Sequence, residues 1–193
     1  GKPKGCVLLH STIIAGAGSF NSLGISVTPT DYFLSFLPLA HIYAMVVEII
    51  AIVQGARIGF ARGPVKDLID DIRVLRPTIM VAVPRILNRV VQAMRSKIET
   101  KPAFVQKIVD FTFKLKIKAI KENRAPSLLL DNLILKDMKN ALGGRMRLIV
   151  SGGAPILEDA FNMFSSAVTP NVIQGYGLTE TAAGVAVQEI PAK

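Results

Sequence analysis

The chain has 193 residues, half of them hydrophobic, which is enough to build the core of one domain or a large part of one. Its single cysteine, Cys6, excludes an intramolecular disulfide and favours a reducing compartment. The formal net charge of +9 leaves nucleic acid, anionic lipid and anionic cofactors open as partners. The most apolar stretch, at 42–56, contains Glu48 and Gln54 and is short for a bilayer, so it predicts a buried helix.

The first half of the chain alternates short apolar runs with longer helical patterns. In chain order we expect a strand at 32–37, a helix at 40–54, a strand at 57–61, a helix at 65–75, a strand at 78–83 and a helix at 85–98. Pro38 ends the first strand, and Gly55 ends the first helix. Pro84 suits the first turn of the last helix, where its missing N–H costs nothing.

The second half begins with two helical patterns and then returns to the alternation. In chain order we expect helices at 104–121 and 127–142, a strand at 146–150, a helix at 156–167, an extended segment at 172–173 and a strand at 184–188. Strands that alternate with helices predict an α/β fold with a mainly parallel sheet flanked by helices. In such sheets, ligands bind beyond the carboxyl ends of the strands. The loops to consider follow Leu37, Val83, Val150 and Ile173.

The helix predicted at 104–121 is amphipathic and basic. Phe104, Ile108, Phe111 and Leu115 share one face, and Lys107, Lys114 and Lys121 repeat every seven residues on another. Three interpretations of these lysines remain open: a solvated helix face, peripheral contact with an anionic membrane, and binding of nucleic acid. No motif that reads nucleic acid accompanies them, so we expect no nucleic-acid partner.

Two common phosphate-binding loops are excluded. A Walker loop requires Gly-Lys followed by Ser or Thr, whereas Pro3 follows Gly1 and Lys2 here. A dinucleotide-binding fingerprint requires a third glycine three positions after its second one, and neither Gly-x-Gly sequence has it. Any phosphate site must therefore be built in another way.

Three other loops carry suitable chemistry. Residues 1–5 form a glycine-framed loop in which Lys4 offers a cation to phosphate oxygens. Residues 151–155 join a strand to a helix, and their two glycines let a flat ligand approach the main chain. Residues 174–181 combine the ring of Tyr176, the hydroxyl of Thr179 and the carboxylate of Glu180. Each loop also has a purely structural interpretation as a solvated or tight turn, but the third combines a base platform, a hydroxyl and a hard metal ligand.

Taken together and in order, these segments resemble the adenylate-forming (AMP-binding) superfamily, and within it the long-chain fatty acyl-CoA synthetases. Residues 1–5 are similar to the end of the family's phosphate loop, and 143–155 to the loop beside adenine. Residues 36–41 are similar to its second core motif, with 46–48 fitting the long-chain branch, and 76–85 to the stretch before the next helix. Residues 175–181 are similar to its most diagnostic motif. The resemblance runs from the first residue to the last.

The resemblance implies an enzyme that activates a fatty acid with Mg-ATP to acyl-AMP and pyrophosphate and then forms acyl-CoA. It implies that Tyr176 stacks on adenine, that Thr179 binds the α-phosphate and that Glu180 holds Mg²⁺. His41 is expected near the reacting carboxylate or the phosphate, from the other side of the cleft; without the resemblance it would be interpreted as a packed residue at a helix N-terminus. The remaining residues expected around ATP or AMP are Lys4, Gly153, Ala154, Pro155, Gln174, Gly175 and Gly177. The acyl channel is expected along Ile42, Tyr43, Leu178 and Ala182.

The family's ribose-binding aspartate and its C-terminal domain with the catalytic lysine have no counterpart in the sequence. We therefore expect residues 1–193 to be part of the AMP-binding domain and to be inactive as an isolated segment, so the step with coenzyme A needs more of the protein. The expected location is intracellular, either cytoplasmic or peripheral on the cytosolic face of a membrane. Two alternatives stay open: a non-catalytic nucleotide- or acyl-binding module of the same fold, and a ligase for aryl or other carboxylates.

Overall fold

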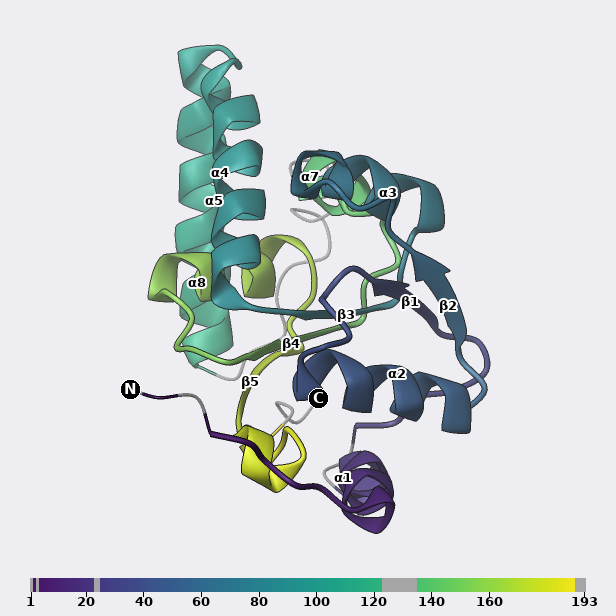
Figure 1. The fold of residues 1–193 in the computed structure, drawn as a ribbon. Coiled ribbons are helices and arrows are strands. Elements are labelled where there is room, and N and C mark those ends of the chain that lie inside the picture. The colour runs from purple at the N-terminus through teal and green to yellow at the C-terminus, as the bar shows by residue number, and fades with distance from the viewer. Residues whose placement is uncertain (1, 3, 23–24, 123–134, 190–193) are drawn as a thin grey trace.

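The protein is described from a computed structural model that covers residues 2, 4–22, 25–122 and 135–189. A six-stranded sheet with the order β2-β1-β3-β4-β5-β6 forms its centre (Figure 1). The strands are β1 (Tyr32–Ser35), β2 (Arg57–Phe60), β3 (Ile79–Ala82), β4 (Leu148–Gly152), β5 (Val172–Tyr176) and β6 (Ala186–Val187). All neighbouring strands are parallel except β6, which runs antiparallel to β5. The prediction of a mainly parallel α/β sheet is confirmed.

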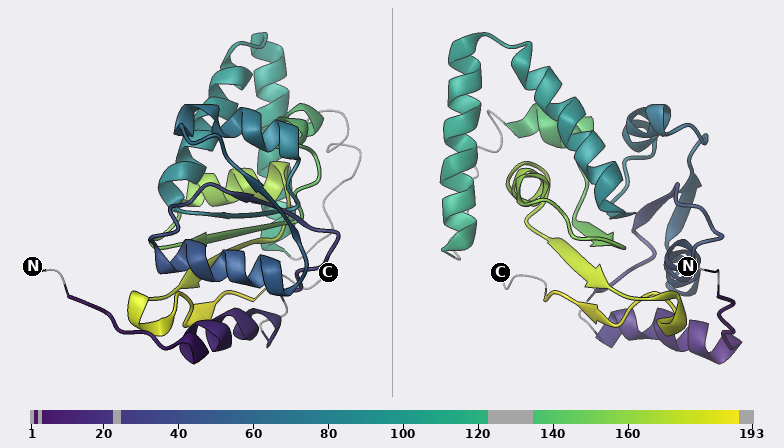
Figure 2. Two further views of the ribbon diagram at one scale, coloured as in Figure 1. Left: turned by 45° about the vertical axis from the view of Figure 1, so that its right-hand side comes forward. Right: turned by 60° about the vertical axis from the view of Figure 1, so that its left-hand side comes forward.

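Helices cover both faces of the sheet (Figures 1 and 2). One face packs on α1 (His10–Ser22) and α2 (Ile42–Val53). The other packs on α3 (Leu68–Leu75), α4 (Pro84–Glu99), α7 (Lys136–Ala141) and α8 (Glu158–Ala167). Side chains of β3 alternate between the two cores: Ile79 and Val81 belong to the first, Met80 and Ala82 to the second. Because successive strand residues point to opposite faces, a strand buried on both sides must be apolar throughout.

A hairpin of two long helices stands on the second face. Helix α4 leads into α5 (Ala103–Lys121), which packs along α8 and forms the outermost layer in Figure 2. The helix predicted at 127–142 is observed as α7 at its end, and the rest of it lies largely outside the described residues. None of the helices in the described part of the chain combines the length and the apolar character that a membrane crossing requires.

The structure corrects the predicted elements in three places. Helix α1 was not predicted, because the apolar residues of 10–22 do not repeat at a clear helical spacing. Strands β4 and β5 extend further than predicted, to Gly152 and Tyr176, because Gly152 pairs with Gly175 of β5 and Tyr176 pairs with Ala186 of β6. The helix predicted at 65–75 begins with the 3-10 turn η1 (Val65–Asp67) before α3.

Candidate functional site

A cleft of about 620 Å³ opens at the carboxyl ends of the central strands. All four loops that the sequence indicated contribute to its lining, through Leu37 and His41, Val83, Gly153, and the segment 175–180. Parallel strands bring these loops to one edge of the sheet, although they lie far apart in the chain. The cleft is therefore the place where separate sequence motifs meet.

The N-terminus of α2 forms one wall of the cleft. His41 occupies the N-cap position with an extended backbone, and its side chain is exposed and makes no capping hydrogen bond. The first N–H groups of a helix have no partner within the helix, so this end of α2 offers several donors and a positive dipole end to an anion. An imidazole and a helix N-terminus thus face the same cleft.

Tyr43 lies at the inner end of the cleft, between α2 and the sheet. Its hydroxyl donates a hydrogen bond to the carbonyl of Val150 across 3.3 Å, and burial raises the pKa of this hydroxyl. The ring covers Gly152 so closely that a Cβ on this glycine would lie 3.0 Å from the Cζ of Tyr43. A side chain at position 152 would therefore displace the tyrosine.

Tyr176, at the end of β5, forms the opposite wall. Its side chain is 63% exposed, and its carbonyl accepts a hydrogen bond from the N–H of Val185 at 2.8 Å. The backbone is thus held by the pairing with β6 while the ring stays open to a ligand. Gly175 and Gly177 border the cleft on either side of the ring.

Thr179 and Glu180 belong to the 3-10 turn η3 (Thr179–Thr181), which Thr181 holds together. The hydroxyl of Thr181 accepts a hydrogen bond from the N–H of Leu178 and donates one to the Leu178 carbonyl, both at 3.0 Å. The side chains of Thr179 and Glu180 are exposed at the cleft and bond to no other described residue. The turn therefore presents one hydroxyl and one carboxylate without local partners.

Gly177 is required by the packing of this turn. A Cβ on Gly177 would lie 1.2 Å from the carbonyl oxygen of Ala183, which is an impossible distance. The chain can fold back over position 177 only because no side chain is present there.

The cleft brings together ten of the predicted site residues: His41, Ile42, Tyr43, Gly153, Gly175, Tyr176, Gly177, Leu178, Thr179 and Glu180.

Five other predicted site residues do not line the cleft. Lys4 is exposed, Ala154 and Pro155 lie in the exposed loop just after Gly153, and the Gln174 side chain bonds to the backbone of Ile156. Ala182 is 1% exposed and packs against Gly16 of α1. Sequence reasoning missed Phe20, which lines the cleft from the unpredicted helix α1.

The described residues contain no group of three or more His, Cys, Asp or Glu side chains that could hold a metal ion alone. The cleft does offer the unpaired carboxylate of Glu180. A single carboxylate suits Mg²⁺ that takes its other ligands from phosphates and water. The donor set therefore fits a metal that arrives with a polyphosphate.

A mainly parallel sheet with a ring platform, a hydroxyl, a carboxylate and a helix N-terminus around one cleft defines a ligand-binding α/β domain with features suited to a nucleotide phosphate. Comparison with known proteins shows to which family the chain belongs. The sequence model of the AMP-binding enzyme family matches residues 1–193, so the chain belongs to that family.

Curated relatives are similar along almost the whole chain. Long chain acyl-CoA synthetase 7, peroxisomal, of Arabidopsis thaliana is 36% identical over 98% of this chain and 27% of its own length. Long-chain-fatty-acid--CoA ligase 1 of Homo sapiens is 35% identical over 95% of this chain and 27% of its own. The chain thus spans about a quarter of the length of these relatives.

Among solved structures, the N-terminal domain of FACL13 from Mycobacterium tuberculosis matches with a TM-score of 0.63 and 25% identity, over 96% of this chain and 36% of that one. The expected fold, a part of the large N-terminal domain of an adenylate-forming enzyme, is therefore confirmed.

Proposed function

We propose that the full-length protein is a long-chain fatty acid–CoA ligase and that the cleft of residues 37–44, 152–153 and 175–180 is its adenylation site. In this reaction the fatty acid carboxylate attacks the α-phosphate of ATP, a P–O bond forms, and pyrophosphate leaves. The thiol of coenzyme A then attacks the acyl carbonyl, and AMP leaves. The similarity to long-chain ligases supports this substrate class.

The single observation that carries the proposal is that His41, Tyr176, Thr179 and Glu180 line one cleft. The side chains of Thr179 and Glu180 bond to no other described residue and are free to bind a ligand. The Tyr176 ring, held by its backbone bond to Val185, provides a face on which adenine stacks. The Thr179 hydroxyl donates to the α-phosphate, and Glu180 holds Mg²⁺, which neutralises phosphate charge when bound. Positioning and fixed charge are the main requirements of such a step.

His41 and the N-terminus of α2 approach the reacting groups from the other side. The orphan N–H groups of the helix attract the carboxylate or the phosphate, and the imidazole donates a hydrogen bond to them. Lys4, Ala154 and Pro155 are proposed to complete the nucleotide site in the full-length protein.

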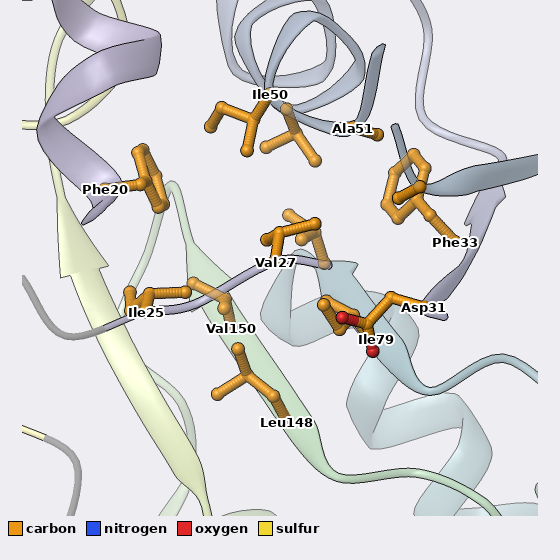
Figure 3. A pocket seen from close by; sticks show the side chains of 13 residues that line it. Phe20, Ile25, Val27, Asp31, Phe33, Ile50, Ala51, Ile79, Leu148 and Val150 are labelled. Atoms are coloured by element: carbon orange, nitrogen blue, oxygen red, sulfur yellow. The ribbon is translucent and has the colours of Figure 1, made fainter. Parts of the chain in front are cut away.

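The acyl chain is proposed to enter past Ile42, Tyr43 and Leu178, on the side of α2 that faces the sheet. A second, apolar cavity of about 30 Å³ lies there and shares Phe20 and Val150 with the cleft. Figure 3 shows Val27, Ile50 and Ile79 pointing into it. This volume holds only about two water molecules, so a long acyl chain requires Tyr43 and α2 to move outward.

The remaining expectations belong to the same proposal. Residues 1–193 form part of the AMP-binding domain, and the catalytic lysine for the step with coenzyme A belongs to a C-terminal domain outside them. The protein acts in the cytoplasm or at the cytosolic face of a membrane, where Lys107 and Lys114 contact anionic lipid. Lys121, the third lysine of the predicted row, is paired with Glu158 in the structure.

ATP–pyrophosphate exchange by the full-length protein, measured with carboxylates of increasing chain length, tests the proposal. We expect exchange to require Mg²⁺ and to be fastest with long-chain fatty acids. Exchange that responds only to aryl acids would indicate another ligase, and the absence of exchange with every acid would indicate a non-catalytic module.

A further inference from the structure

Helix α5 turns a row of large apolar side chains toward solvent. Phe104 is 66% exposed, Ile108 46%, Phe111 62% and Leu115 41%. Their spacing of three and four residues places them on one side of the helix, and we call them the α5 stripe. A different side of α5, with Val109 and Thr112, is buried against the body of the protein. The stripe spans about 17 Å along the helix.

A row of lysines runs beside the α5 stripe. At about 100° per residue, Lys107, Lys114 and Lys118 lie directly next to it, on the side away from the buried residues. All three are exposed, and none forms an ion pair within the described part of the chain. The acidic residue of α5, Asp110, lies further around the helix than these lysines. The arrangement is an apolar ridge with a positive border.

The position of α5 leaves this face accessible. The helix is the outermost layer of its side of the molecule, beyond α8, as the right-hand view of Figure 2 shows. Ile108 and Lys114 also border the grooves that separate α5 from its neighbouring helices, so the open surface is centred on Phe104, Phe111, Lys107 and Lys118.

We infer that the α5 stripe docks on a membrane surface rich in anionic lipid, with the helix lying parallel to the bilayer plane. Apolar side chains gain free energy at the boundary between headgroups and acyl chains, and neighbouring lysines reach the phosphates with their flexible stems. Charge complementarity selects this partner, because an apolar protein groove would leave three adjacent ammonium groups without counter-charges.

The docked helix lies near the proposed adenylation site. The Nζ atom of Lys121, at the end of α5, is 3.4 Å from a carboxylate oxygen of Glu158 at the start of α8. Glu158 follows Gly153, which lines the cleft, by five residues. Docking therefore holds one edge of the cleft near the lipid in which fatty acids partition. The docking extends the lipid contact proposed above for Lys107 and Lys114, but it uses no residue of the cleft, so it can be tested apart from the ligase activity.

Co-sedimentation of the full-length protein with two kinds of vesicle tests the inference. One kind contains phosphatidylcholine alone, and the other contains phosphatidylcholine mixed with phosphatidylserine. We expect stronger binding to the mixed vesicles. Phe104→Ser/Phe111→Ser should weaken binding to them by at least about tenfold. Lys107→Gln/Lys114→Gln should weaken it by about fivefold for each lysine and leave the weaker binding to neutral vesicles unchanged.

Matched controls lie on another part of the surface. Val74, which is 86% exposed on α3, and the exposed Lys66 supply Val74→Ser and Lys66→Gln, which should bind as the unaltered protein does. Circular dichroism and Tm check that all variants fold. The inference is wrong if the phenylalanine variant binds like the controls, or if the unaltered protein binds neither vesicle. In the second case another protein or another part of the chain covers the stripe.

A separate assay distinguishes failure of docking from failure of the proposed function. ATP–pyrophosphate exchange with a long-chain fatty acid dissolved below its micelle concentration, and no vesicles, should be equal in the unaltered protein and the phenylalanine variant. Vesicle binding without any exchange would contradict the ligase proposal alone. Exchange without vesicle binding would overturn the docking inference alone.

Discussion

The side-chain carbonyl of Gln174 accepts a hydrogen bond from the backbone N–H of Ile156, with 3.1 Å between oxygen and nitrogen. This bond ties β5 to the loop that follows β4. The N–H of Gln174 in turn donates to the side chain of Gln188 at 3.0 Å. Cofactor binding by Gln174 stays a prediction, and its side-chain oxygen meanwhile holds two walls of the cleft in register. We therefore assign it a positioning role.

Replacing Gln174 with methionine should loosen the cleft without removing a ligand contact. The variant leaves the half-buried N–H of Ile156 without its acceptor, so the free energy of unfolding should fall by about 1 kcal/mol. The KM for ATP should rise several-fold, with a smaller change in kcat. Urea unfolding and steady-state kinetics measure both effects. Gln174→Glu retains an acceptor and should rescue most of the KM, whereas equal defects in the two variants would argue against positioning.

The exposed ring of Tyr176 should matter through its face rather than its hydroxyl. Tyr176→Phe keeps the ring, so the Kd for ATP should remain close to that of the unaltered protein. Tyr176→Ala removes the stacking surface and should raise this Kd by about tenfold or more. Isothermal titration of the full-length protein with ATP compares the two. Similar losses in both variants would show that the hydroxyl, not the ring, makes the contact.

Glu180→Gln should change the dependence on metal concentration. The amide keeps the shape of the side chain but loses the charge that attracts Mg²⁺. We expect the Mg²⁺ concentration for half-maximal pyrophosphate exchange to rise, and excess Mg²⁺ to restore part of the rate. The exposed Glu189 supplies the control Glu189→Gln, which should leave the titration unchanged. An unchanged Mg²⁺ titration in the Glu180 variant would refute its role as a metal ligand.

Gly177 and Gly18 should respond to alanine in opposite directions. The Cβ of Gly177→Ala would collide with the backbone oxygen of Ala183, so the segment around η3 must rebuild, at a cost of about 3 kcal/mol or more. Gly18 lies in α1 with open space around the new Cβ, and Gly18→Ala should stabilise the protein by up to about 1 kcal/mol. Thermal unfolding measures both changes, and pyrophosphate exchange should be lost in the Gly177 variant alone.

The stability of the protein should decrease in acid partly through Asp31. Burial alone raises the pKa of this carboxyl, but hydrogen bonds from Arg147, Thr78 and Thr28 outweigh it and hold the pKa well below its usual range. A lowered native pKa stabilises the fold at pH values above the unfolded pKa of about 3.9, and this contribution is lost as the pH falls toward the native value.

Asp31→Asn should therefore lower the free energy of unfolding at pH 7 by about 2 kcal/mol and flatten its decrease below pH 4 or so. Urea denaturation across this pH range compares the variant with the unaltered protein. An identical slope in the two proteins would mean that other carboxyls account for the acid sensitivity.

Much of the fold follows from local patterns that the sequence displays openly. The runs that became β1, β2 and β3 are apolar and bounded by proline or glycine, so their ends were predicted to within two residues. Helix α1 was not predicted, because its burial depends on the contact of Phe20 with α2 and the sheet and not on a periodic pattern of apolar residues. The ends of β4 and β5 were not predicted for a similar reason, since β4 ends by pairing with β5 and β5 ends by pairing with β6.

The sequence by itself determined the alternation of strands and helices, the four loops at which to look for a site, and the family resemblance of their motifs. These are local properties, because turn residues, the hydrophobic period and the spacing within a motif depend only on residues that are close together in the sequence. Only the tertiary structure decided that Gln174 holds two loops together, that Ala182 is buried beneath α1, and that the apolar row of α5 faces solvent. Each of these depends on which surface a neighbouring element covers, and this is settled only when distant segments pack against one another.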